Sequence, residues 1–133
     1  LARLEARFRE MLARQQVVTL GTETLHKKKE KADDRLNRAD RLVLQKYTKE
    51  EYTLAEHAQQ ALEIILEDGT SVVFPKVVAQ LRDDLAGVAE LMENNKTGGF
   101  THAMHKDIEL AVVAVVVAIR TKTTSHCCLV LPN

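Results

Sequence analysis

The sequence predicts an all-α fold, an antiparallel helical hairpin within a bundle of four or five helices with coiled-coil-like packing. Two apolar stripes indicate it, one from Phe74 to Met92 and one from Leu1 to Val18, each with apolar residues spaced alternately four and three apart. The composition agrees, because Trp is absent and aromatic residues make up only 4% of the chain. That balance favours close helix packing over aromatic platforms for nucleic-acid bases.

The length of 133 residues allows one domain, or a piece of a longer protein. We expect residues 1–120 to form a single bundle domain and 121–133 to form a tail without a regular period. The 19 basic and 19 acidic side chains cancel, so no overall field attracts nucleic acid or an anionic membrane. The longest uncharged apolar run, 110–119, is roughly half of what a membrane-spanning helix needs, which predicts no membrane span.

The N-terminal stripe predicts a first helix in which Gln15 is a polar interruption and Gly21 marks a break or kink, since glycine weakens a helix. Its apolar members are Leu1, Leu4, Phe8, Met11 and Val18. The strongly charged segment 26–46 follows. We interpret it as a solvated helix or connector, with a phosphate-contacting stripe as the alternative.

The central hairpin is predicted from a start signal and a stop signal. Thr48 is placed to cap a helix and Glu51 to reach back in a capping box, while Tyr47 packs on Tyr52 as a hydrophobic staple. Gly69 ends this helix at a short turn.

The second helix of the hairpin is expected to begin between Ser71 and Phe74, because Pro75 suits a first turn. It is expected to end at Lys96 to Gly99, where a cation and glycines are typical of a helix terminus. Its buried stripe is Phe74, Val78, Leu81, Leu85, Val88 and Met92.

The last predicted helix starts with Thr101 as its N-cap and runs through the valine-rich tract 110–119. Helix is favoured there, but β-branched residues lower helix propensity. The tract could instead be a strand paired with 127–131.

A family resemblance supports a helical fold. The elements MLARQQ, RADRL, LEDGTSVVFPKVVAQLRDDL and KTGGFTHAMHKDIE resemble an uncharacterised helical region of large coiled-coil proteins from planctomycete bacteria. The resemblance spans about Glu10 to Arg120 and is most specific from Gly69 to Leu85. It implies a structural protein of the bacterial cell envelope, with no catalytic residues to carry over. The tract LAVVAVVVAI and the tail SHCCLVLPN depart from that family.

No residue pattern identifies a catalytic, cofactor or metal site. His102 and His105 share one side of a helix, but a structural metal site needs four ligands. The adjacent Cys127 and Cys128 beside His126 suit neither a disulfide framework nor a tight tetrahedral site. We therefore expect no enzyme activity and no cofactor.

The predicted function is a non-catalytic scaffold or protein-interaction module that binds a protein partner or a second copy of itself. The residues assigned to that surface are Leu4, Phe8, Met11, Val112, Val115 and Val116. The alternative is nucleic-acid or polyanion binding through the basic 27–41 segment. Its cationic residues are Lys27, Lys28, Lys29, Lys31, Arg35, Arg38 and Arg41.

Overall fold

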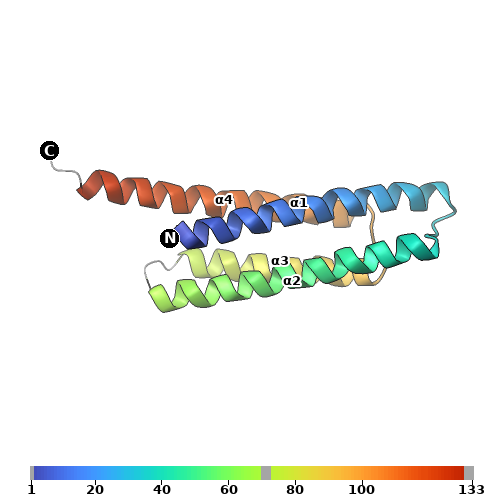
Figure 1. Cartoon of the computed structure of the whole chain (residues 1–133), viewed down its shortest axis with the longest axis horizontal. Helices are drawn as coiled ribbons and strands as arrows, with labels where there is room; N and C mark the ends of the chain where they lie inside the picture. Colours follow the sequence, from blue (N-terminus) through green and yellow to red (C-terminus); the bar gives the residue numbers. More distant parts are fainter. Residues whose placement is uncertain (1, 70–72, 131–133) are drawn as a thin grey trace.

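A computed structural model describes residues 2–69 and 73–130, with side chains described for 3–69 and 74–121. These residues form four helices and no strand: α1 (Ala2–Lys31), α2 (Arg38–Asp68), α3 (Val73–Glu93) and α4 (Gly99–Val130). Each helix packs on the next, and α4 packs on α1 (Figure 1). The chain turns back at every connection, with the α1–α2 and α3–α4 turns at one end. The predicted all-α helical bundle is confirmed.

Helix α1 runs without a break through Gly21, so the predicted interruption is wrong. Gly21 has a packing role instead, because a Cβ atom there would overlap the ring of Tyr47 on α2. The glycine allows the tyrosine to lie against the backbone of α1.

The α1–α2 turn contains two residues with left-handed backbone, Asp33 (φ 52°) and Asp34 (φ 62°). The N–H of Asp34 donates to the carbonyl of Lys29 at 2.9 Å, which satisfies a group that the ending helix leaves free. Helix α2 then starts at Arg38, and the side chain of its N-cap, Asn37, accepts a hydrogen bond from the N–H of Asp40.

The predicted capping box at Thr48 is therefore wrong, because Thr48 lies inside α2. Its hydroxyl donates to the carbonyl of Leu44 at 2.8 Å, one turn back. Glu51 does not reach back to a helix terminus, since it is fully buried in the core. A threonine followed by a glutamate three residues later also fits a buried polar stripe, and this is how the chain uses it.

The predicted stop at Gly69 is confirmed. Gly69 has a left-handed backbone (φ 65°), and its N–H donates to the carbonyl of Ile65 at 3.1 Å. Helix α3 begins at Val73 with Pro75 in its first turn. Residues 70–72, which include the predicted start at Ser71, lie outside the described residues.

The end of α3 depends on Asn95 and not on the glycines. Asn95 is left-handed (φ 60°) and donates to Met92, and Lys96 donates to Leu91, the two backbone bonds of a Schellman motif. The glycines at 98 and 99 instead lead into α4. Thr101 lies within α4, where its hydroxyl donates to the carbonyl of Lys96, so it is not the predicted N-cap.

The valine-rich tract 110–119 is helical, as favoured over the strand alternative. Helix α4 continues to Val130 and projects past the rest of the bundle (Figure 1). The backbone at the start of the predicted tail is thus helical. The side chains of Cys127 and Cys128 lie outside the described residues.

The core consists of two apolar clusters separated by polar residues. The larger cluster is built by all four helices and includes Phe8, Leu54, Leu81, Leu85, Ile108 and Val115. The smaller cluster lies toward the end with the α1–α2 turn and consists of Val18, Leu25, Leu44 and Met92. The stripes predicted along α1 and α3 supply both clusters, and Phe74 is half-buried beside the larger one.

Candidate functional site

A buried polar layer separates the two apolar clusters. We use this name for Gln15 and Thr19 on α1, Glu51 on α2 and His105 on α4, all of which are buried. Gln15 Nε2 donates to Glu51 Oε2 at 3.0 Å and lies 3.3 Å from the Thr19 hydroxyl. His105 Nε2 lies 3.0 Å from Glu51 Oε2. The layer therefore joins three of the four helices through one carboxylate.

Several atoms of the buried polar layer lack hydrogen bonds. Neither ring nitrogen of His105 makes one, because the close approach of Nε2 to Glu51 has the distance of an ion pair but not the alignment of a hydrogen bond. Gln15 Oε1 and Glu51 Oε1 are also without partners. Buried groups of this kind cost free energy. Since Glu51 and His105 are fully buried, a ligand reaches them only if the helices separate.

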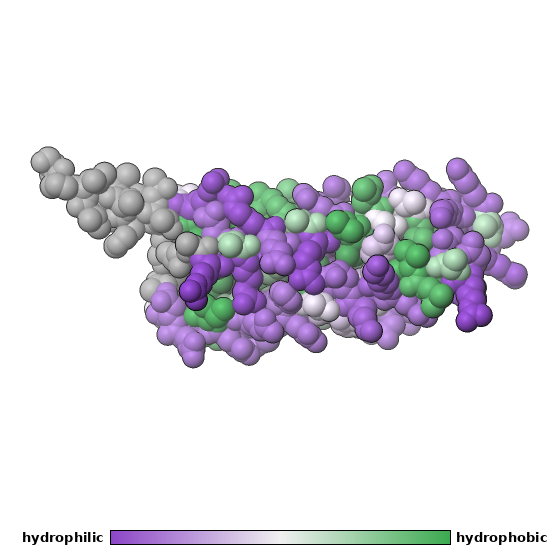
Figure 2. Space-filling model, viewed as in Figure 1, coloured by the Kyte–Doolittle hydropathy of each residue, from purple (hydrophilic) through white to green (hydrophobic). Residues whose placement is uncertain are grey.

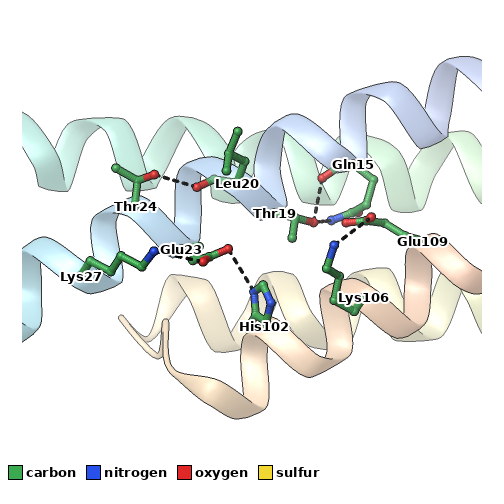
Figure 3. Close-up of polar contacts among 9 residues, drawn as sticks. All are labelled: Gln15, Thr19, Leu20, Glu23, Thr24, Lys27, His102, Lys106 and Glu109. Carbon is green, nitrogen blue, oxygen red and sulfur yellow. Dashed lines mark hydrogen bonds and ion pairs between the residues drawn. The ribbon is translucent and has the colours of Figure 1, made fainter.

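Polar contacts also link α1 and α4 near the surface (Figure 3). Glu23 on α1 lies 3.3 Å from Lys27 Nζ and 3.8 Å from His102 Nδ1 on α4. His102 thus points toward α1, whereas His105 contacts Glu51 on α2, and the two do not face a shared position. Within residues 2–69 and 73–130, no three His, Cys, Asp or Glu residues are arranged to hold a metal ion.

The basic residues of the 27–41 segment divide into two sets. Lys27 and Lys28 are exposed but have carboxylate neighbours, since Lys27 pairs with Glu23 and Lys28 lies 3.3 Å from Asp40. Lys31 and Arg38 are exposed. The remaining three, Lys29, Arg35 and Arg41, line a surface pocket.

This pocket has a volume of about 770 Å³ and lies where the α1–α2 and α3–α4 turns meet. We call it the turn pocket. Its charged lining residues are Lys29, Asp34, Arg35, Arg41 and Lys96, and the first turn of α4 completes the wall. Lys96 was missed in the sequence because the turn that carries it lies far from the basic segment along the chain.

The six residues predicted to form a partner surface are all buried within the single chain. They are Leu4, Phe8, Met11, Val112, Val115 and Val116, and all belong to the larger apolar cluster. The four helices of the bundle cover these faces within one chain. A partner reaches these side chains only if the bundle opens.

The outer face of α4 contains an apolar surface that the sequence reasoning did not separate from the buried face. Leu110, Val113 and Val117 are 67%, 41% and 54% exposed, and Ala114 and Ala118 beside them are exposed too. We call these five residues the α4 stripe. Their spacing of three and four was visible in the sequence, but a tract that is apolar on all sides does not indicate which side is covered.

Comparison with protein families, with curated proteins and with solved structures finds no match to this chain. The resemblance to planctomycete coiled-coil proteins therefore stays a prediction. Among the described residues, no helix is both long and apolar enough to cross a lipid bilayer.

Proposed function

We propose that this chain is a non-catalytic helical interaction module that binds a second copy of itself through the α4 stripe. The observation that carries the proposal is the outer face of α4 between Leu110 and Ala118, where every exposed side chain is apolar. Charged residues occupy the same face just before and after it, at Lys106, Asp107 and Arg120. The apolar surface is therefore local to about two turns of helix.

The composition of the stripe favours a helix-binding role. Surface positions of a helix are ordinarily filled by charged or polar residues of high helix propensity. Val113 and Val117 lower that propensity and expose apolar area to water, which is unfavourable unless another surface covers it. The exposed leucine at 110 adds the largest side chain of the set.

A second copy is the partner that this surface suits. The stripe carries no charge, so an apolar surface of matching length is required to cover it, and a second α4 supplies one. Helix α4 also continues past the bundle (Figure 1), so two such helices have length available for side-by-side packing. The face shown in Figure 2 has green hydrophobic patches on a mostly hydrophilic surface. The residues of the α4 stripe are spaced three and four apart along the helix. This heptad-like spacing supports coiled-coil-like packing of the two α4 helices as part of the same proposal.

The test is sedimentation of the wild-type chain across a wide concentration range, together with two double variants. We expect the wild type to form a dimer as its concentration rises, and Leu110→Lys with Val117→Lys to remain a monomer. The matched control is Ile64→Lys with Leu66→Lys on α2, where the wild-type side chains are 44% and 58% exposed. This control should still form a dimer.

Two results would contradict self-association through α4. One is a wild-type chain that stays a monomer at the highest concentration reached. The other is equal loss of dimer in the α2 control and the α4 variant, which would indicate a general effect of added charge. Circular dichroism of every variant establishes that the helices are intact.

Polyanion binding along the 27–41 segment remains a second candidate. The observation that favours it is the exposure of most cations of this segment, namely Lys27, Lys28, Lys31, Arg35, Arg38 and Arg41. Salt-dependent retention of DNA, lost on replacing Lys27, Lys28 and Lys29 together, would support it. Unchanged retention in that variant would oppose it.

A further inference from the structure

We propose that the turn pocket binds the phosphate group of a small phosphorylated ligand. The inference is independent of self-association, because the pocket lies at the end of the bundle with the α1–α2 and α3–α4 turns, whereas the α4 stripe lies along the outside of α4. It also differs from the polyanion candidate. That candidate needs a track of surface charges, and this one needs a single concave site.

Lys29 is held in place between the two turns. Its side chain is only 13% exposed, and Nζ donates to the carbonyl of Asn95 at 2.5 Å. Asp34 Oδ1 lies at 4.0 Å. An ammonium group has three donor hydrogens, so Lys29 keeps hydrogen-bonding capacity for a ligand. Burial of most of its stem restricts where the charge lies.

The other cations of the pocket also keep N–H donors that are available to a ligand. Arg41 Nη1 donates to the carbonyl of Leu36 at 2.8 Å, which orients the guanidinium and leaves its remaining N–H groups. The side chains of Arg35 and Lys96 make no hydrogen bond or ion pair with the described residues. Four cations thus share the pocket, and Asp34 is the one carboxylate among its described lining residues.

This concentration of positive charge favours an anion. Like charges that share a partly enclosed surface repel one another, since the effective dielectric there is lower than in bulk water. A phosphate with charge near −2 offsets that repulsion, and its oxygens match the paired N–H groups of a guanidinium. The pocket wall also includes Gly99 to Thr101. These residues form the first turn of α4, whose N–H groups have no acceptor within the helix.

The size of the pocket indicates a small molecule. A volume of about 770 Å³ falls within the range of small-ligand pockets and exceeds what one phosphate fills. Phe100, which is 71% exposed, lies on the same wall and offers an apolar face to the rest of the ligand. Outside the pocket, Lys27 and Lys28 already have carboxylate neighbours, so a continuous track for many phosphates is interrupted.

The test is calorimetric titration of the full chain with pyrophosphate at low salt, repeated with a nucleoside diphosphate. We expect saturable binding of one pyrophosphate per chain. Because charge-assisted hydrogen bonds are lost, Arg35→Gln and Lys96→Gln should each weaken binding by about tenfold. The matched controls are Lys31→Gln and Arg38→Gln, which remove exposed cations at the same end of the bundle but outside the pocket lining, and these should change affinity by less than about twofold.

Amide chemical shifts locate the ligand. Pyrophosphate should shift the N–H resonances of Gly99 and Phe100, and those of the α4 stripe should stay in place. The proposal is overturned if pyrophosphate does not bind, or if the control variants weaken it as much as the pocket variants do. A single-stranded oligonucleotide that binds equally well with and without a 5′-phosphate, while pyrophosphate fails to compete, would also overturn it.

Discussion

His105 on α4 and Glu51 on α2 contact each other across the diagonal of the bundle, with Nε2 3.0 Å from Oε2 and neither side chain exposed. The two helices do not pack on each other, because α2 packs on α1 and α3, and α4 packs on the same two. The pair therefore links helices that otherwise contact only through their neighbours. Gln15 from α1 donates to the same carboxylate oxygen, so one oxygen sets the register of three helices.

Breaking this pair should cost more than removing it entirely. Glu51→Leu or His105→Leu alone leaves the other polar group buried without its neighbour, and we expect each to lower the free energy of unfolding by about 3 kcal/mol. The double variant restores apolar packing and should cost less than either single variant. Urea unfolding followed by circular dichroism measures all four chains of the cycle.

Additive effects in that cycle would contradict the coupling between Glu51 and His105. Gln15→Leu is the third step, since the amide of Gln15 keeps only the Thr19 hydroxyl as an acceptor when Glu51 is replaced. Adding Gln15→Leu to the double variant should raise stability, whereas Gln15→Leu in the wild type should lower it.

The effect of Gly21→Ala on the free energy of unfolding should change sign when the Tyr47 ring is removed. Alanine at an exposed helix position is more stable than glycine by about 1 kcal/mol. In the wild type the added Cβ would overlap the Tyr47 ring, so Gly21→Ala should be destabilising. In a Tyr47→Ala background the ring is gone, and the same substitution should stabilise the chain by about 1 kcal/mol. Chemical unfolding of the four chains measures both effects. Stabilisation by Gly21→Ala in both backgrounds would contradict the close contact between Gly21 and the Tyr47 ring.

The start of α2 provides a third prediction. Asn37→Ala removes the acceptor for the N–H of Asp40 and should cost about 1 kcal/mol. Asn37→Asp keeps an N-cap acceptor and serves as the control. Thr48→Val should be near neutral, because the Thr48 hydroxyl donates only to a carbonyl that already lies within the helix. Thermal unfolding measures both variants. A larger loss of stability for Thr48→Val than for Asn37→Ala would indicate that Thr48, and not Asn37, is the N-cap.

The predictions from sequence succeeded where the signal is local. The stripe from Phe74 to Met92 and the stop at Gly69 depend on spacing and on backbone conformation within a few residues, and both are confirmed. The break at Gly21 and the cap at Thr48 failed for a shared reason. Gly21 packs against Tyr47 of α2, and Glu51, the other member of the predicted capping box, contacts Gln15 of α1 and His105 of α4. The sequence alone does not indicate these contacts between helices.

The candidate sites depend on distant contacts even more strongly. The basic segment supplied Lys29, Arg35 and Arg41, but the pocket exists because the α3–α4 turn brings Lys96 and the start of α4 beside them. For α4, the valine tract predicted an apolar surface on all sides. Only the packing of α1 and α3 on α4 distinguishes the buried Val112 from the exposed Val113.

Tyr52 gives a prediction about pH. Its hydroxyl donates to Glu93 Oε2 at 2.6 Å, and this hydrogen bond, with burial and the negative charges of Glu93 and Glu90, raises the pKa of Tyr52 from 10.0 to about 12. The folded chain therefore holds the phenol proton more tightly than the unfolded chain does. The stabilisation is fully present below pH 10 and is lost as the pH rises through about 12.

An absorbance titration of tyrosinate in a Tyr47→Phe background isolates the ionisation of Tyr52, because the chain has two tyrosines and no tryptophan. Glu93→Gln keeps an acceptor but removes the negative charge, so the pKa of Tyr52 should fall back toward 10.0. The same variant should lose the alkaline decline in the free energy of unfolding that the wild type shows between pH 10 and about 12. Identical titrations of the Glu93 and Glu93→Gln chains would mean that the negative charge of Glu93 does not control the ionisation of Tyr52.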